Sequence, residues 1–423
     1  MAPGQARDAA GNLTLGAIPA EHLAAEYGTP LLVIDLGVVD AAIDELKRGA
    51  QAHDVEISYA AKAFATVEFL RHVASRGIGV DVCSLGELVT AERAGFPAAR
   101  VTLHGAGKTD EELAAAGSGR LGYIAVDGLE ELGRLARLAR DGPSAQVLLR
   151  LNAGVDVETH AFVRTGGNDT KFGIHPRDES AAASMLRENP HLRFAGLHAH
   201  IGSQIRQTQS YLAAATALAG AAERFARRGL PVRRLVIGGG FGVQTRPEAN
   251  DETLDVAATI REVAASVAAQ SRARGIPVPQ VGIEPGRALV AAAGTTLYRV
   301  LAVKPQTNRT FVIVDGGIAE NPRPALYGAR HHVLTAAPAS GERETVTLCG
   351  RSCENDELGV VALPRGVRTG DLLAMCATGA YTYSMAGNYN RFPRPAVAAV
   401  SNGSHRRLAR RESVDDVLRN DAE

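Results

Sequence analysis

Several features that would define other classes of protein are scarce in this sequence. Only four cysteines, scattered along the chain, occur in 423 residues, so neither a disulfide framework nor a zinc site is expected. Forty-six basic residues balance forty-six acidic ones, which favours neither nucleic acid nor an anionic membrane as a partner. No stretch approaches the roughly 20 apolar residues of a membrane span, and the N-terminus lacks a basic segment followed by an apolar core. We therefore expect a cytoplasmic protein that acts on small molecules.

The hydrophobic residues, 45% of the chain, form strand-like runs that alternate with segments of helical periodicity. Eight such runs lie at about 55–60, 78–84, 99–104, 123–127, 145–151, 194–200, 233–238 and 280–285. An open doubly wound sheet usually stops nearer six strands, so eight alternations predict a parallel (β/α)8 TIM-like barrel over 41–285.

The pattern changes after residue 285 to strand-like runs without helices between them, such as TTLYRVLAV, RTFVIVDG and RETVTLCG. This change predicts a C-terminal antiparallel β-barrel or sandwich domain over 286–423. The strand-like PLLVIDL at 30–36 suggests that the N-terminal segment 1–40 joins this β domain.

Polar residues follow several barrel strands, at the face where such barrels hold their chemistry. Lys62 interrupts SYAAKAFA directly after the first strand, and GLHAHIGSQI places His198, His200 and Ser203 at the exit of the sixth. The glycines 238–240 follow the seventh strand, where exposed backbone N–H groups suit a phosphate. The eighth strand ends in EPGR.

Each feature also has an ordinary structural interpretation. An isolated lysine is more often a solvated cation, and a lone histidine is more often packed than catalytic. A glycine run is usually a turn, and EPGR could end its strand with an exposed ion pair. These interpretations weaken because all four features would have to meet by chance on one barrel face.

Together the features predict a ligand with an aldehyde, a phosphate and an aromatic ring nitrogen, and pyridoxal 5′-phosphate has all three. Lys62 would form a Schiff base with the aldehyde, the glycine run would hold the phosphate, and Glu284 would keep the ring nitrogen protonated. A protonated ring is a strong electron sink, so a carboxylate at this position favours decarboxylation over a restrained racemisation.

With these residues placed, the chain resembles the fold type III (alanine racemase-like) pyridoxal-phosphate decarboxylases, and among them the diaminopimelate decarboxylases most. The similarity runs end to end. It is carried by EYGTPLLVID (26–35), YAAKA (59–63), GVDVCSLGEL (79–88), HGAGKTDEEL (104–113), TGGNDTKFGI (165–174), HAHIGSQI (198–205), GGGFG (238–242), EPGR (284–287), DGGIAENPRPALYGAR (315–330), CEND (353–356) and TGAYTYSMAGNYNRFPRP (378–395).

The resemblance implies decarboxylation of meso-2,6-diaminopimelate to L-lysine and CO2, the last step of lysine biosynthesis, in a homodimer with shared active sites. Lys62 would carry the cofactor, His200 would stack on its ring, and Glu284 would pair with its nitrogen. The remaining cofactor-binding residues would be Ser203, Gly239, Gly240, Gly286, Arg287 and Tyr381, and the substrate-binding residues Arg287, Arg323, Tyr327, Glu354 and Tyr381. Cys353 would be the acid near Cα, and Cys353 and Glu354 would come from the partner subunit. No metal is expected.

The charges of the substrate region can be interpreted separately. A lysine or ornithine decarboxylase must hold a distal ammonium, whereas Arg323, with a proline on either side, offers a planar fork for a carboxylate. With Glu354 for an ammonium, the pair would recognise the distal amino-acid group that diaminopimelate carries. Alternatively, Arg323 is a surface residue in a proline-rich turn.

Two departures from the family keep alternatives open. The family usually has Ser-Gly-Asp after the Cys-Glu pair, whereas this chain has Asn355-Asp356-Glu357, and Leu85 stands where glycine is common. The chain could therefore be a related decarboxylase for another amino acid or for a siderophore or carrier-bound intermediate. A noncatalytic pyridoxal-phosphate carrier would not need the β domain, and a cofactor-free aldolase could use Lys62 directly on its substrate.

Overall fold

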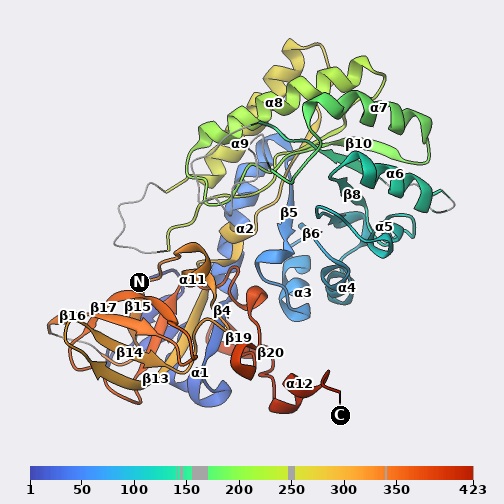
Figure 1. Cartoon of the computed structure of the whole chain (residues 1–423). Coiled ribbons are helices and arrows are strands. Elements are labelled where there is room, and N and C mark those ends of the chain that lie inside the picture. Colours follow the sequence, from blue (N-terminus) through green and yellow to red (C-terminus); the bar gives the residue numbers. More distant parts are fainter. Residues whose placement is uncertain (141, 143–145, 155–169, 246–252, 339–340, 423) are drawn as a thin grey trace. The chain divides into compact units, whose positions relative to one another are not determined.

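The computed structural model describes residues 1–140, 142, 146–154, 170–245, 253–338 and 341–422 (Figure 1). The chain forms two compact units. One unit consists of Ile43–Gly242 and Glu252–Gly286, and the other consists of Met1–Ala42, Val243–Asp251 and Arg287–Glu423. The motif predicted at 165–174 lies partly outside the described residues.

Eight parallel strands close the first unit into a barrel, as the eight hydrophobic runs predict. They are β5 (Glu56–Ala60), β6 (Gly79–Val82), β7 (Val101–Leu103), β8 (Tyr123–Val126), β9 (Gln146–Arg150), β10 (Arg193–His198), β11 (Arg234–Val236) and β12 (Gln280–Ile283). Each strand pairs with the next, and β12 pairs with β5 to close the ring. All the strand ends that carry the predicted chemistry therefore lie on one face.

The barrel strands alternate with helices (Figure 1). These are α3 (Val67–Ser75), α4 (Leu85–Ala94), α5 (Asp110–Ala116), α6 (Leu129–Leu138), α7 (Glu179–Glu188), α8 (Thr208–Arg227) and α9 (Val256–Ala273), while α2 (Leu36–Ala50) precedes the barrel. Several begin at a side-chain cap, which satisfies a backbone N–H that has no partner within the helix. Thr66 caps α3, Ser84 caps α4, Asp255 caps α9, and Thr109 and Glu112 form a reciprocal capping box on α5.

A nine-stranded sheet forms most of the second unit. Its strands are β4 (Leu31–Asp35), β13 (Gly294–Pro305), β14 (Thr310–Val314), β15 (Val333–Thr335), β16 (Arg343–Cys349), β17 (Glu357–Pro364), β18 (Leu372–Cys376), β19 (Ala396–Ser401) and β20 (Ser404–Ala409). The N-terminal strand β4 joins this sheet, between β13 and β19. Most strand pairs of this sheet are antiparallel, as the sequence predicts. Two pairs are parallel, β14 with β16 and β4 with β19.

Shorter elements complete the second unit. They are β1 (Gln5–Arg7), β2 (Leu13–Leu15), β3 (Ile18–Pro19), α1 (Ala20–Tyr27), α10 (Arg287–Val290), α11 (Arg323–Tyr327) and α12 (Val414–Leu418). Short 3-10 helices occur in both units, at Gln51–His53, Ala61–Ala63, Ala98–Arg100, Pro176–Asp178, Tyr383–Met385 and Tyr389–Arg391. Two buried apolar clusters pack the sheet, one around Leu31 and Leu297 and one around Tyr298 and Leu348. Among the described residues, no helix combines the length and the apolar character that crossing a membrane requires.

Candidate active site

Lys62 lies directly beyond the end of β5, in the 3-10 turn Ala61–Ala63. Ala61 and Ala63 are buried while Lys62 is exposed, so the turn directs the one polar side chain outward. The buried Tyr59 hydroxyl donates to the carbonyl of Phe64 at 2.8 Å and fixes this turn. A small-residue turn anchored on both sides thus holds the amine at the C-terminal face of the barrel.

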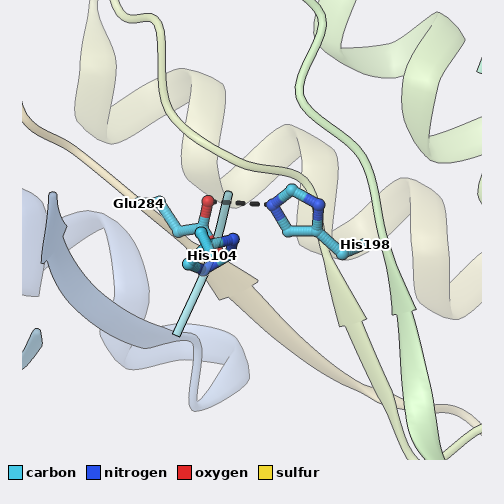
Figure 2. Close-up of side chains that lie close together, drawn as sticks. All are labelled: His104, His198 and Glu284. Atoms are coloured by element: carbon cyan, nitrogen blue, oxygen red, sulfur yellow. Dashed lines mark hydrogen bonds and ion pairs between the residues drawn. The ribbon is translucent and has the colours of Figure 1, made fainter. Parts of the chain in front are cut away.

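Glu284 follows β12 and lies between two imidazoles (Figure 2). Nε2 of His198, the last residue of β10, is 3.0 Å from Oε2 of Glu284. Nε2 of His104, which follows β7, is 3.2 Å from Oε1 of Glu284 and 3.7 Å from Oδ1 of Asp81 on β6. The ends of four barrel strands therefore bring one carboxylate, two imidazoles and a second carboxylate together.

The charges of this group follow from burial and from mutual contact. Burial opposes ionisation of Glu284, but His104 and His198 outweigh it and hold the pKa of Glu284 well below its ordinary value. Burial alone would lower the pKa of His104, yet Glu284 and Asp81 raise it to about 9. Burial lowers the pKa of His198 to about 4, although the neighbouring Glu284 acts to raise it. At neutral pH Glu284 is an anion, His104 is a cation, and a neutral His198 donates its Nε2–H to Glu284.

Two imidazoles and a carboxylate are also the donor types of zinc sites. The ligand-type atoms of His104, His198 and Glu284 all lie within 4.8 Å of one another, so the described residues include one group that could hold a metal, although the sequence predicted none. The short contacts within the group already use these atoms as ion-pair and hydrogen-bond partners.

The glycine run after β11 is packed too closely for side chains. A Cβ on Gly239 would overlap the carbonyl oxygen of Glu284, and one on Gly240 would overlap that of Gly202. Gly238 and Gly240 also adopt φ values of 78° and 89°, which glycine tolerates without strain. The run is therefore bare backbone packed beside Glu284, and phosphate-binding loops use backbone of this kind.

The structure places His200 beside this glycine run, in the segment after β10 that also carries Ser203. The N–H of Gly239 donates a hydrogen bond to Nδ1 of His200 at 3.3 Å, so this imidazole is held against the glycine run. Burial, followed by Lys62 and Arg150, holds the pKa of His200 well below its ordinary value. His200 is therefore neutral, which suits stacking on a ring. Gly286 is buried immediately before α10.

A second group of predicted residues lies in the other unit. The Arg287 guanidinium lies over the Tyr381 ring, with Cζ 4.8 Å from the ring centre. Arg323, at the start of α11, has its Cζ 5.3 Å from the Tyr327 ring centre and 5.6 Å from that of Tyr381. Burial and then the neighbouring Arg287 lower the pKa of Arg323 to about 10. Among the described residues, the groups that act on the pKa of Arg323 include no carboxylate, and two neighbouring guanidinium groups suit an anionic ligand.

Cys353 and Glu354 are exposed in the loop between β16 and β17. The N–H of Cys353 donates to the Asn390 side chain at 3.2 Å, and the Tyr389 hydroxyl donates to Glu354 Oε1 at 2.5 Å. The buried Asp356 carboxylate accepts from the N–H of Ile318 at 2.7 Å. The altered Asn-Asp-Glu segment therefore has its own anchor, through Asp356.

Sequence reasoning missed several charged residues around the first group. They are Asp81, His104, Arg150 and Asp127, of which Arg150 and Asp127 form a buried ion pair at 3.2 Å. The available signal was their position, because each lies on or just after the end of a barrel strand, as Lys62 and Glu284 do.

Comparisons with known proteins agree with this chemistry. Residues 38–291 match the family model described as "Pyridoxal-dependent decarboxylase, pyridoxal binding domain". The diaminopimelate decarboxylase of Actinosynnema pretiosum is 44% identical, over 97% of this chain and 92% of its own length. The chain belongs to the pyridoxal-dependent decarboxylase family.

Two further relatives of this family cover nearly all of the chain. The diaminopimelate decarboxylase of Bacillus subtilis is 38% identical, over 97% of this chain and 95% of its own. The crystal structure of the M. jannaschii diaminopimelate decarboxylase in complex with L-lysine superimposes with a TM-score of 0.91 and 28% identity, over 100% of this chain and 98% of that one. The barrel-plus-sheet fold predicted from the sequence pattern is confirmed.

The residues present fit the cofactor of a pyridoxal-dependent decarboxylase. Because Gly239 and Gly240 carry no side chain, the run packs directly against the backbone of Glu284 and Gly202, and such bare glycine backbone is what phosphate-binding loops use. The buried anion Glu284 matches a protonated ring nitrogen, and the amine of Lys62 lies at the same barrel face. Pyridoxal phosphate is therefore the cofactor of this family member.

Proposed function

We propose that the chain decarboxylates meso-2,6-diaminopimelate to L-lysine and CO2, with pyridoxal phosphate as its cofactor. Relatives at 35–44% identity over 97% of the chain are diaminopimelate decarboxylases. The observation that favours this substrate is the pair formed by the buried Arg287 and the half-buried Arg323, since a distal carboxylate needs such a pair and a distal ammonium would be repelled by it.

Pyridoxal phosphate, when bound, supplies an aldehyde for amines and a ring that delocalises the electron pair left when CO2 departs. Lys62 would hold the aldehyde between turnovers and would exchange protons with the substrate nitrogen. Glu284 would keep the proton on the ring nitrogen, and the neutral His200 would pack against the ring. The backbone at Gly239, Gly240 and Gly286 would hold the phosphate, with Ser203 and Tyr381.

The second unit supplies the groups that select the substrate and complete its conversion. Arg287 and Arg323 bind the distal carboxylate, with Tyr327 and Tyr381 packed beside their guanidinium groups. Glu354, oriented by the Tyr389 hydroxyl, binds the distal ammonium. Cys353 donates a proton to the carbon that has lost CO2, so the product leaves as an amino acid.

We also propose that Cys353 and Glu354 act in the active site of a second copy of the chain. Leu326 on α11 is 50% exposed and Val360 on β17 is 67% exposed, and α11 and β17 pack against each other. Exposed apolar side chains on adjoining elements suit an isologous contact between two copies. The cytoplasmic location expected from the sequence stays a prediction.

The experiment that tests the substrate assignment measures CO2 release from four amino acids by the purified protein, with and without added pyridoxal phosphate. We expect meso-diaminopimelate to be turned over and lysine, ornithine and arginine to be turned over at least about a hundredfold more slowly, because buried unmatched charges are costly. If lysine, ornithine or arginine were turned over faster than meso-diaminopimelate, the chain would instead be assigned to the related decarboxylases that act on those amino acids.

A further inference from the structure

Two side chains beside Glu284, those of Asp81 and His104, have no part in the proposed function as stated above. We propose that His104 is a positioning residue that holds Glu284 in the orientation and the ionised form required by the cofactor ring. The inference rests on the proposed function, because it assigns a role towards the same cofactor.

The geometry restrains both oxygens of one carboxylate. His198 contacts Oε2 of Glu284 at 3.0 Å, and His104 contacts Oε1 at 3.2 Å from a different strand (Figure 2). The two imidazole rings pack against each other, with centres 4.9 Å apart and planes tilted by 55°. A carboxylate has about four lone-pair sites, so Glu284 keeps sites for a ring nitrogen while its side chain is held from two sides.

Burial makes this restraint necessary. The side chain of Glu284 is 11% exposed and that of His104 is 10% exposed, so water does little to solvate either charge. A buried carboxylate without compensation takes up a proton, and a protonated Glu284 can no longer accept from a protonated ring nitrogen. A nearby cation is therefore needed to keep Glu284 ionised.

The ionisable groups around Glu284 come from several elements. Those that interact with Glu284 electrostatically are Asp81 on β6, Cys83 after β6, His104 after β7, Arg150 on β9, His198 on β10 and His200 after β10. Among the charges acting on Glu284, His104 is the strongest influence that favours ionisation. His198 is the second such influence, and because burial lowers its own pKa to about 4, it is neutral at the pH of the test and acts there through its hydrogen bond.

Glu284, and after it Asp81, explain why His104 carries a charge although it is buried. Neither carboxylate oxygen of Asp81 has a hydrogen bond among the described residues, and Oδ1 faces His104 Nε2 at 3.7 Å. Burial and the neighbouring Glu284 raise the pKa of Asp81 to about 7. Two carboxylates flanking one imidazole favour its protonated form, which makes His104 the shared cation of the group.

The test compares two glutamine variants of the holoprotein. His104→Gln removes the cation and keeps a neutral donor, whereas His198→Gln replaces a neutral donor with another neutral donor. Cofactor affinity is measured by absorbance, without substrate, between about pH 8 and pH 6. The affinity of each variant is then divided by the affinity of the wild type at the same pH. This ratio removes any pH dependence that Lys62 gives to all three proteins.

We expect the affinity ratio of His104→Gln to fall as the pH falls, approaching about tenfold per pH unit. The sign follows from the pKa of Glu284, which His104 holds low: without the cation this pKa rises, so the carboxyl becomes protonated at higher pH. The ratio for His198→Gln should stay constant across the same range.

A constant ratio for His104→Gln would overturn the positioning role, even if the wild type binds pyridoxal phosphate and releases CO2 from diaminopimelate. A wild type that binds no pyridoxal phosphate would instead contradict the proposed function. Elemental analysis of the wild type and of both variants tests whether the group binds a metal instead. A stoichiometric zinc ion that is present in the wild type and lost in both variants would show that the group is a metal site. If His104→Gln fails to fold, His104→Asn, which is also neutral, is measured in its place against the same prediction.

Discussion

At the scale of single residues, Lys62 is the amine on which cofactor attachment depends. Lys62→Ala should abolish covalent attachment of pyridoxal phosphate and lower turnover by at least about a hundredfold, because both the attachment point and a proton-transfer group are lost. Borohydride reduction followed by peptide mapping measures the attachment. Lys304→Ala, at an exposed position of β13, serves as the control and should keep the modified peptide. A reduced cofactor found on Lys62→Ala at another lysine would exclude this role.

Arg323 is the residue whose replacement should separate substrate binding from cofactor binding. Arg323→Ala should raise the KM for diaminopimelate by about 10- to 100-fold, since a charge-assisted contact to a carboxylate contributes about 1.5–3 kcal/mol. Cofactor affinity should change little. Arg365→Ala, which breaks an exposed pair with Glu342, is the matched control. Unchanged kinetics with diaminopimelate would contradict the assignment of the distal carboxylate.

The residues that carry recognisable chemistry could be predicted from sequence, whereas their electrostatic partners could not. Lys62 breaks an apolar run and Glu284 ends a strand before a proline, so each is visible in isolation. His104 and Asp81 acquire a role only because β6, β7 and β12 end on the same face of a closed barrel. A charge that depends on three strands meeting in space leaves no local pattern in the sequence.

At the scale of elements, a buried ion pair ties the segment after β7 to helix α6. Lys108 Nζ donates to Glu131 Oε1 at 2.8 Å and to the carbonyls of Gly105 and Ala125 at 2.9 and 2.6 Å. The same segment carries His104. Lys108→Ala should lower the free energy of unfolding by about 3–5 kcal/mol, because it leaves Glu131 buried without its countercharge.

Chemical denaturation of the barrel, followed by circular dichroism, measures this loss. Arg134→Ala is the control, since it breaks a pair with Asp110, whose side chain is 70% exposed, and should cost no more than about 1 kcal/mol. Equal effects of the two substitutions would mean that the buried pair contributes no more than a surface one.

The elements themselves could be predicted from sequence where their pattern was strong. All eight barrel strands show clear apolar runs, and the closed barrel follows from their alternation with helices. In the second unit, β15 is only three residues long, and β20 (SHRRLA) has four non-apolar residues in six, so neither has a strand-like pattern. The parallel pairings of β14 with β16 and of β4 with β19 depend on which strands meet across the sheet, which local periodicity does not specify.

At the scale of the whole molecule, the proposed dimer predicts complementation between two inactive variants. Lys62→Ala and Cys353→Ala homodimers should each be poor enzymes. When equal amounts exchange subunits at random, half of the dimers are mixed and one of the two sites in each has both native residues, so about a quarter of wild-type activity should return.

The activity of the mixture is measured after mass spectrometry has verified subunit exchange. A mixture of Lys62→Ala with its own differently tagged copy is the control and should recover nothing. If verified exchange between the two variants also restored no activity, Lys62 and Cys353 would have to act within one chain.

The measurement that tests the central claim most directly is the stoichiometry of one reaction, with meso-diaminopimelate and the pyridoxal-phosphate-loaded protein. Lysine and CO2 are quantified together over time. A pyridoxal-phosphate-dependent diaminopimelate decarboxylase should form one L-lysine for each CO2, and Lys62→Ala should form neither. No CO2 from diaminopimelate, or the same CO2 release from Lys62→Ala, would contradict the account.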